Sequence, residues 1–250
     1  AMDFVSGMAI YYVDEVLNGY GSGYLIMLMG VLMVSQLLGM LVFTPIMTRT
    51  SKRTTILIGA PIRIVSTLGL LAFSYEGAPI IPILALAAGI GIGNAATLTS
   101  IFAILADMAD VDELITSTSR PGIVSGMATF ARKISAGLSV WIIGILLSLV
   151  GYDAKLAQSG VRQALFTQRG IAMIFIIIPV VLVAFLLLFG YIFPITNKEF
   201  TVVKQDIARR RGEDDSVATD EEKRILERAT GFAYEDLWKK SNEHRLHNHK

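Results

Sequence analysis

Two adjacent cations, Arg132 and Lys133, interrupt a long apolar segment and are the side chains best placed to do chemistry. The segment begins at Pro121, which suits the first turn of a helix because it has no N–H to leave unpaired. Lys133 lies roughly 18 Å further along the helix axis, close to the middle of a hydrocarbon layer about 30 Å thick. A cation at that depth costs at least about 2.5 kcal/mol, so we expect Lys133 to face a water-filled path or a partner rather than lipid.

The neighbours of Lys133 at four-residue spacing are Ser125, Thr129 and Gly137, so one face of this helix is polar and then small. Such a face is typical of a helix that lines a water-filled path. A lysine that pairs with an acid on a neighbouring helix and only holds the bundle together is the alternative. Arg132 lies about 100° around the helix from Lys133, so it needs a partner of its own or must reach the membrane surface.

Carboxylates gather just before this segment, and we expect them to form an acidic loop on the cytoplasmic side of the preceding span: Asp107, Asp110, Asp112 and Glu113. Ion pairs from these acids to Arg120 or Arg49 would open and close a path across the membrane. A solvated loop is the alternative.

Two further polar side chains fall inside apolar segments. Arg63 follows Pro61, and we expect it to snorkel to the cytoplasmic surface or to pair with an acid there. Asn94, with Thr97 and Thr99, either reaches a cavity or hydrogen-bonds helices together.

The composition is that of a polytopic membrane protein. Of the 250 residues, 53% are hydrophobic and only 17% are charged, and the mean hydropathy is +0.58. Soluble domains carry about 25% charged residues. The net charge of +1 gives no reason to expect a nucleic-acid partner, and the chain has no cysteine. All three histidines lie in the last seven residues: His244, His247 and His249. We expect a disordered end there rather than a metal site. Because the apolar segments contain neither histidine nor cysteine, an enzyme is the function class with the least support.

Continuously apolar runs predict an all-α membrane protein with six transmembrane helices, at about 1–16, 24–47, 55–73, 80–106, 121–150 and 171–193. The first run looks clipped at its start, so we expect a piece of a longer protein. The basic residues of 48–53 and of the tail place both chain ends in the cytoplasm. The segment between the fifth and sixth runs is also basic, against this rule: Lys155, Arg162 and Arg169.

The polar tail has its own helix signals. Thr219 and Glu222 fit a capping box before a helical run at 223–229, and Gly231 is placed to end that helix. The aromatic patch at 232–238 is expected to rest on the membrane surface or on cytoplasmic loops.

Small residues crowd the fourth and fifth runs, among them Gly89, Gly91, Gly93, Gly122 and Gly126. Small residues let transmembrane backbones approach closely. Close packing and sliding of one helix past another during a conformational change are both open interpretations.

Several of these motifs occur in one order: Tyr11-Tyr12, the basic loop at 48–53, the acidic run 107–113 with Arg120 and Gly122, the segment Phe130–Lys133, and Gly151-Tyr152. Together they resemble the C-terminal half of the glycoside–pentoside–hexuronide:cation symporters, melibiose-permease relatives in the major facilitator superfamily. The resemblance implies two six-helix halves with the substrate between them. Residues 1–195 would be the C-terminal six-helix half-domain, helices 7–12, and residues 196–250 a cytoplasmic polar tail.

By this resemblance, Lys133 and Thr129 bind the sugar. Leu98 stands where the melibiose carrier has a stacking tryptophan, and Ala128 where it has a glutamine, so we expect a sugar other than melibiose. Asp107, Asp110, Asp112 and Arg120 would form a cytoplasmic gate. The main site of the co-transported Na⁺ or H⁺ is expected in the N-terminal half, and no other cofactor is implied.

The function predicted from the sequence is secondary active transport of a sugar or glycoside with a cation, by alternating access in a bacterial cell membrane. The expected partners are the lipid bilayer, the N-terminal half and the sugar. The alternatives are a sodium-coupled carrier of lipids or other organic solutes, and a membrane scaffold whose tail binds a soluble protein.

Overall fold

The computed structural model describes residues 2–19, 21–192 and 197–238, and all regular structure in these ranges is helical. The helices are α1 (Met2–Tyr11), α2 (Tyr24–Arg49), α3 (Lys52–Gly69), α4 (Ile80–Thr116), α5 (Pro121–Leu149), α6 (Ala154–Gln158), α7 (Leu165–Ile192), α8 (Asn197–Arg211) and α9 (Asp220–Thr230). A π-helical turn, η1 (Tyr12–Val16), continues α1, and 3-10 turns follow α3 and α9 at η2 (Leu70–Phe73) and η3 (Tyr234–Asp236). The predicted all-α class is confirmed.

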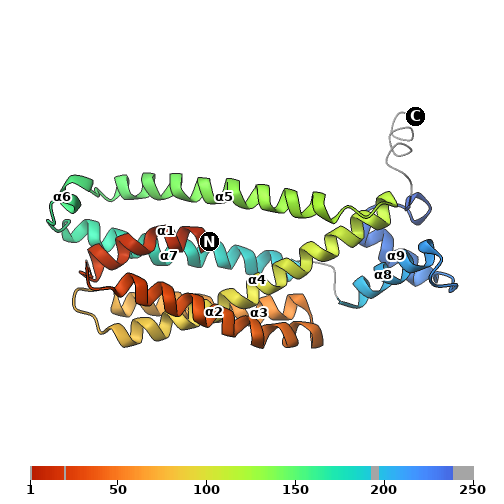
Figure 1. Cartoon of the computed structure of the whole chain (residues 1–250), viewed down its shortest axis with the longest axis horizontal. Coiled ribbons are helices and arrows are strands. Elements are labelled where there is room, and N and C mark those ends of the chain that lie inside the picture. Colours follow the sequence, from red (N-terminus) through yellow and green to blue (C-terminus); the bar gives the residue numbers. More distant parts are fainter. Residues whose placement is uncertain (1, 20, 193–196, 239–250) are drawn as a thin grey trace.

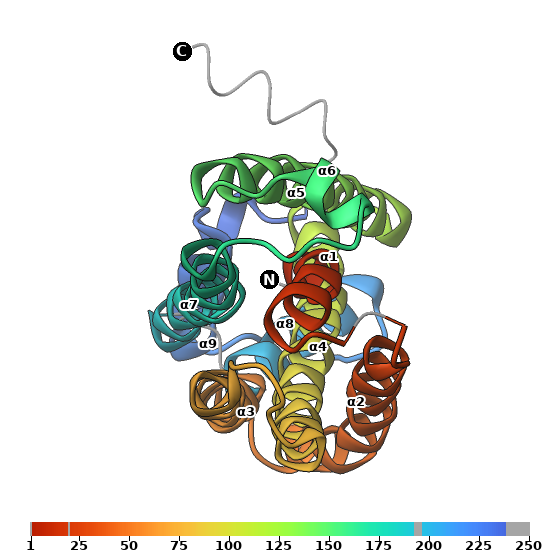
Figure 2. The same ribbon diagram turned by 90° about the vertical axis from the view of Figure 1, so that its left-hand side faces the viewer.

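Five helices of the described chain are long and apolar enough to cross a membrane: α2, α3 with η2, α4, α5 and α7. The first predicted span corresponds to α1 and η1. Figure 1 shows the long helices running side by side, with α5 along one edge of the bundle and α8 and α9 beside the far end of α4. In the view along the bundle, α4 lies between α2 and α3 (Figure 2).

Helix α4 packs tightly on both neighbours because glycines remove side chains from the contacts. A Cβ atom added at Gly93 would lie 2.6 Å from the Gly59 carbonyl oxygen and 2.7 Å from the Arg63 Cβ, and one at Gly39 would lie 2.7 Å from the Ala95 Cβ. Real Cβ atoms do not approach other atoms this closely, so side chains at these positions would push the helices apart. The small residues of α4 therefore serve close packing.

Helix α5 has a different environment. Its buried side chains, Ile143 and Leu147, lie near its C-terminal end, where it packs against α1. Cβ atoms added at Gly122, Gly126 and Gly137 would meet nothing within 4 Å. These glycines therefore pack against no part of the described chain.

The loops at one end of the bundle are joined to each other. Arg162, between α6 and α7, donates a hydrogen bond of 2.5 Å to Glu76, and Asn18 donates one of 3.0 Å to the same carboxylate. Tyr12 stacks on Phe175 with ring centroids 4.4 Å apart. The basic segment between the fifth and sixth predicted runs therefore lies at the same end of the bundle as Glu76, in the loop after the third run.

The expected acidic loop is wrong, because α4 continues through the whole carboxylate run to Thr116. The extension is covered by the tail: α8, α9 and η3 enclose it in a small hydrophobic core of Leu114, Phe200, Val203, Ile207, Leu226 and Leu237. The Trp238 N–H donates to the Leu114 carbonyl over 2.9 Å. Burial of Leu114 and the added contacts keep these residues helical where composition alone favours a loop.

The tail helix signals are confirmed. Thr219 and Glu222 form the capping box of α9, and Gly231 ends it with a φ of 76°. The aromatic patch folds back on the end of α4 through Tyr234, Leu237 and Trp238. The three histidines lie outside the described residues.

Two tail carboxylates are stabilised in their charged form. The Thr219 N–H, 2.8 Å from Glu222, lowers the pKa of that carboxyl, and the Arg209 guanidinium at 3.1 Å lowers it further. The pKa of Asp214 is lowered by hydrogen bonds from the Ser216 backbone N–H and side chain. A carboxylate whose pKa is lower in the folded state adds stability at pH values above its ordinary pKa, and that stability is lost as the pH falls through the folded-state value.

Replacement of Leu226 by alanine should detach the tail, because this fully buried side chain fills the centre of the tail core. A cavity of this kind costs about 2–5 kcal/mol. Hydrogen exchange of the α9 amides should therefore accelerate strongly, while the exposed control Arg224→Ala leaves it unchanged. Equal protection in Leu226→Ala and the control would show that the tail core does not hold α9.

The tail should stay docked from pH 8 to about pH 5 and loosen only below pH 4.5, the ordinary pKa of Glu222. Trp238 fluorescence in a Trp141→Phe background reports this transition. Glu222→Gln should diminish the acid transition. A midpoint near pH 6.5 would show that a histidine, not these carboxylates, controls docking.

Candidate functional site

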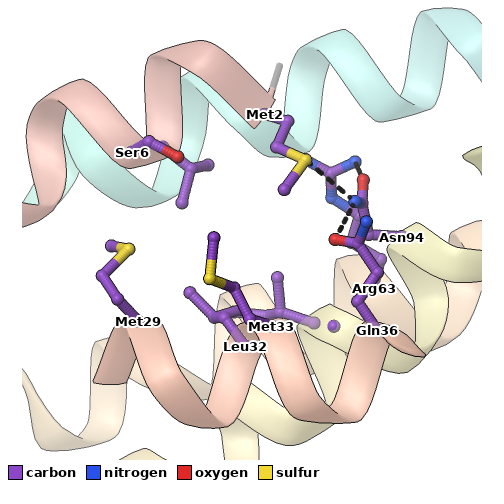
Figure 3. A pocket seen from close by; sticks show the side chains of 11 residues that line it. Met2, Ser6, Met29, Leu32, Met33, Gln36, Arg63 and Asn94 are labelled. Carbon is purple, nitrogen blue, oxygen red and sulfur yellow. Dashed lines mark hydrogen bonds between the residues drawn. The ribbon is translucent and has the colours of Figure 1, made fainter. Parts of the chain in front are cut away.

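A small pocket opens between α1 and α2 and ends at three polar side chains from α2, α3 and α4. Its volume is about 50 Å³. Figure 3 shows Gln36, Arg63 and Asn94 together at one end, with methionines and Ser6 around the rest. At the mouth, Met2 is 41% exposed and Met33 is 65% exposed.

The polar end of the pocket is a hydrogen-bonded chain. Arg63 Nη1 donates to Asn94 Oδ1 over 2.8 Å, and Asn94 Nδ2 donates to Gln36 Oε1 over 2.9 Å. Asn94 Nδ2 also lies 3.2 Å from the Met2 sulfur. Asn94 therefore lines a cavity and also hydrogen-bonds neighbouring helices together, so both interpretations of this residue are correct.

The expectation that Arg63 snorkels to the surface or pairs with an acid is wrong. The side chain is 4% exposed and its partner is a neutral amide. The absence of a side chain at Gly93 lets α3 approach α4 so closely that the Arg63 stem passes into the bundle instead of along its surface.

The residues predicted to bind sugar lie on two helices. Lys133 and Thr129 are exposed on α5, with Ala128 half-buried beside them, and Leu98 is half-buried on α4. Lys133 has no ion-pair or hydrogen-bond partner in the described ranges, and no described pocket joins Leu98 to the α5 residues. The sugar-binding roles of these four residues stay predictions.

The carboxylates at the end of α4 each have a basic partner. We call Asp107, Asp110, Asp112 and Glu113 the α4 carboxylate cluster. The pairs are Asp107 with Lys52, Asp110 with Lys204 (4.0 Å), Asp112 with Arg120 (3.2 Å) and Glu113 with Arg211 (2.9 Å). Of the two partners expected from the sequence, Arg120 pairs with the cluster, whereas Arg49 forms no ion pair within the described chain.

Sequence reasoning missed three of these partners, Lys52, Lys204 and Arg211. All three belong to the basic segments that the positive-inside rule assigns to one side of the membrane, so the sequence does indicate that they lie on the same side as one another. That rule gives the side but not the pairing. Two of the ammonium groups also lie over the Phe200 ring, at 4.6 Å for Lys52 and 5.1 Å for Lys204.

The arrangement is suited to binding and conformational change. Arg63 and Lys133 offer positive charge inside the hydrophobic segments, where hydrogen-bond acceptors are scarce. The α4 carboxylate cluster joins α3, α4, α5 and α8 by ion pairs that can break and reform without covalent chemistry. Tyr11 packs edge-on against Tyr152, with ring centroids 5.3 Å apart, and so joins the end of α1 to the loop after α5.

Comparison with known proteins gives one family. The sequence pattern of the family described as MFS/sugar transport protein matches residues 1–197. The glucuronide carrier protein homolog of Escherichia coli strain K12 is 27% identical over 219 residues, covering 83% of this chain and 44% of the relative.

Two shorter matches, each 31% identical, are to putative sulfoquinovose importers. The Escherichia coli K12 protein matches over 121 residues (48% of this chain, 24% of the relative), and the Salmonella typhimurium LT2 protein over 116 residues (44% and 22%). The chain thus spans less than half the length of these relatives. The pattern match covers every candidate membrane helix, and the chain belongs to the MFS/sugar transport protein family.

Proposed function

We propose that this chain is the C-terminal half of a secondary active transporter that moves a sugar together with Na⁺ or H⁺ by alternating access. The observation that carries the proposal is the match of residues 1–197 to a sugar-transport family. A second support is α5, which carries an intramembrane cation and packs against the bundle mainly near its C-terminal end. An N-terminal six-helix half would cover the rest of α5 and enclose a substrate between the halves.

The relatives favour a sugar that carries a negative charge. One is named a glucuronide carrier homolog and two are named sulfoquinovose importers. Glucuronides bear a carboxylate and sulfoquinovose bears a sulfonate. A cationic Lys133 near the membrane midplane, with Thr129 one turn earlier, suits such a substrate.

The α4 carboxylate cluster is proposed as the cytoplasmic gate. Lys52 and Arg211 tie the end of α4 to α3 and α8, while Arg120 ties it to the start of α5. Opening a path at this end would break some of these ion pairs, which costs free energy. Joint binding of cation and sugar would offset this cost by favouring the closed state from which the transporter can reorient. By the positive-inside rule, the basic residues at this end favour the cytoplasmic side of the cell membrane.

A second candidate is a carrier for lipids or another organic solute, because Leu98 offers an aliphatic surface where the melibiose carrier has an aromatic ring. The scaffold alternative has less support, since Leu226, Leu237 and Trp238 of the tail pack on the end of α4. A panel of glycosides, uronides and lysophospholipids, tested with Na⁺ and pH gradients imposed separately, distinguishes the sugar carrier from the lipid carrier.

Replacement of Lys133 by alanine in the complete transporter should abolish uphill sugar accumulation, because the substrate–cation network loses its intramembrane charge. Accumulation in proteoliposomes under a Na⁺ or pH gradient measures this effect. The control Lys155→Ala, an exposed lysine on α6, should accumulate sugar normally. Normal accumulation by Lys133→Ala would remove this lysine from the mechanism.

The Glu113–Arg211 pair should act as a unit in a double-mutant cycle. Arg211→Gln leaves the Glu113 carboxylate, 5% exposed, without its guanidinium partner. We expect each single change to glutamine to slow uptake about threefold and the double change to slow it no further, the sign of direct coupling. Arg228→Gln, on the exposed face of α9, is the control. Additive single effects would place the pair outside the gate.

A further inference from the structure

Arg63 is a buried cation without a counter-ion. Its guanidinium group has one hydrogen-bond partner, the neutral Asn94 side chain, and no carboxylate lies within 4.0 Å of it among the residues that the structure describes. Arg63 Nε is buried and has no acceptor. An isolated buried ion loses several kcal/mol of hydration, and a neutral amide returns only part of that.

The position of Arg63 makes this loss severe. Arg63 lies about 16 Å along α3 from Lys52, and Asn94 lies about 20 Å along α4 from Asp107, at 1.5 Å per residue. The Lys52–Asp107 ion pair marks the same end of both helices. Both members of the pair are thus near the middle of a layer about 30 Å thick. An arginine keeps its charge even at that depth, so burial of Arg63 favours a partner of opposite charge that enters the bundle.

The pocket beside Arg63 has the size and chemistry for a small anion. Its volume of about 50 Å³ gives room for a carboxylate or sulfonate group. Arg63 retains unused N–H donors, while Asn94, which is itself hydrogen-bonded to Gln36, holds the guanidinium in position. The apolar wall keeps water scarce, which strengthens an ion pair formed there. Asp3, which follows the pocket residue Met2 on α1, does not itself line this pocket.

We propose that Arg63, held in place by Asn94 and Gln36, binds the carboxylate or sulfonate of an anionic sugar whose ring lies at the pocket mouth between α1 and α2. This inference rests on the proposed function, because it assigns the charged group of the transported sugar to a site in the C-terminal half. The planar guanidinium donates paired hydrogen bonds that match either anion.

The test compares phenyl β-D-glucuronide with phenyl β-D-glucoside, which differ in one carboxylate, as substrates of the complete transporter in proteoliposomes. Arg63→Met should weaken glucuronide binding about 30-fold or more, the scale for truncating a buried charged partner, and change glucoside binding little. The control Arg53→Met alters an arginine on the same helix that stacks on Tyr191, and should leave the preference between the two sugars unchanged.

A second variant guards against misfolding. Asn94→Asp has the same shape and places a carboxylate 2.8 Å from Arg63 Nη1, so the guanidinium gains an internal counter-ion. Gln36 can rotate its amide to donate to the new oxygen. The protein should be at least as heat-stable as the parent and yet lose its glucuronide preference.

The outcomes separate the two proposals. If the parent takes up neither sugar, the proposed function fails. If it takes up either sugar and Asn94→Asp keeps the parental preference, the Arg63 site is overturned. If both variants weaken both sugars equally, Arg63 pairs instead with a carboxylate of the other half, and the proposal is also overturned. Loss of glucuronide binding alone, in both variants, supports it.

Discussion

The close contact of α4 with α2 and α3 is the interaction on which the rest of the structure depends. Glycines at 39, 59 and 93 let three helix backbones meet with almost nothing between them. Within a membrane there is little hydrophobic force to hold helices together, so such close van der Waals contact is a main source of stability. The same contact draws Arg63 off the surface and into hydrogen-bonding range of Asn94.

Helix α4 then connects the two sites of the molecule. Its middle carries Asn94, which orients the buried guanidinium, and its far end carries the α4 carboxylate cluster, which the tail encloses. A shift of α4 along its axis would therefore move the anion pocket and strain the ion pairs at the end together. In the proposed mechanism, this one continuous helix would link the charge of the substrate to the gate without any intervening residue.

Much of this fold was predictable from the sequence. Long apolar runs gave the spans, and Thr219, Glu222 and Gly231 gave both ends of α9, because capping is a local property. The acidic run is helical although its composition favours a loop, because its helical state depends on contacts with tail residues at 200–238. Arg63 was misplaced because its direction is fixed by Gly93 on another helix. The ion pairs that Lys52 and Arg211 form with α4 depend on which basic segment reaches this helix. That is a property of the tertiary structure, which the sequence pattern does not give.

The central claim is that the polar face of α5 lines a substrate path that opens to each side of the membrane in turn. This chain contains no cysteine, so Thr129→Cys in a cysteine-free complete transporter is a single reporter. Membrane-impermeant thiol reagents applied from either side should label Cys at position 129, in proportions that shift with the imposed ion gradient, and bound sugar should block labelling. Labelling by lipid-soluble reagents alone, without protection by sugar, would show that this face meets lipid and would contradict the account.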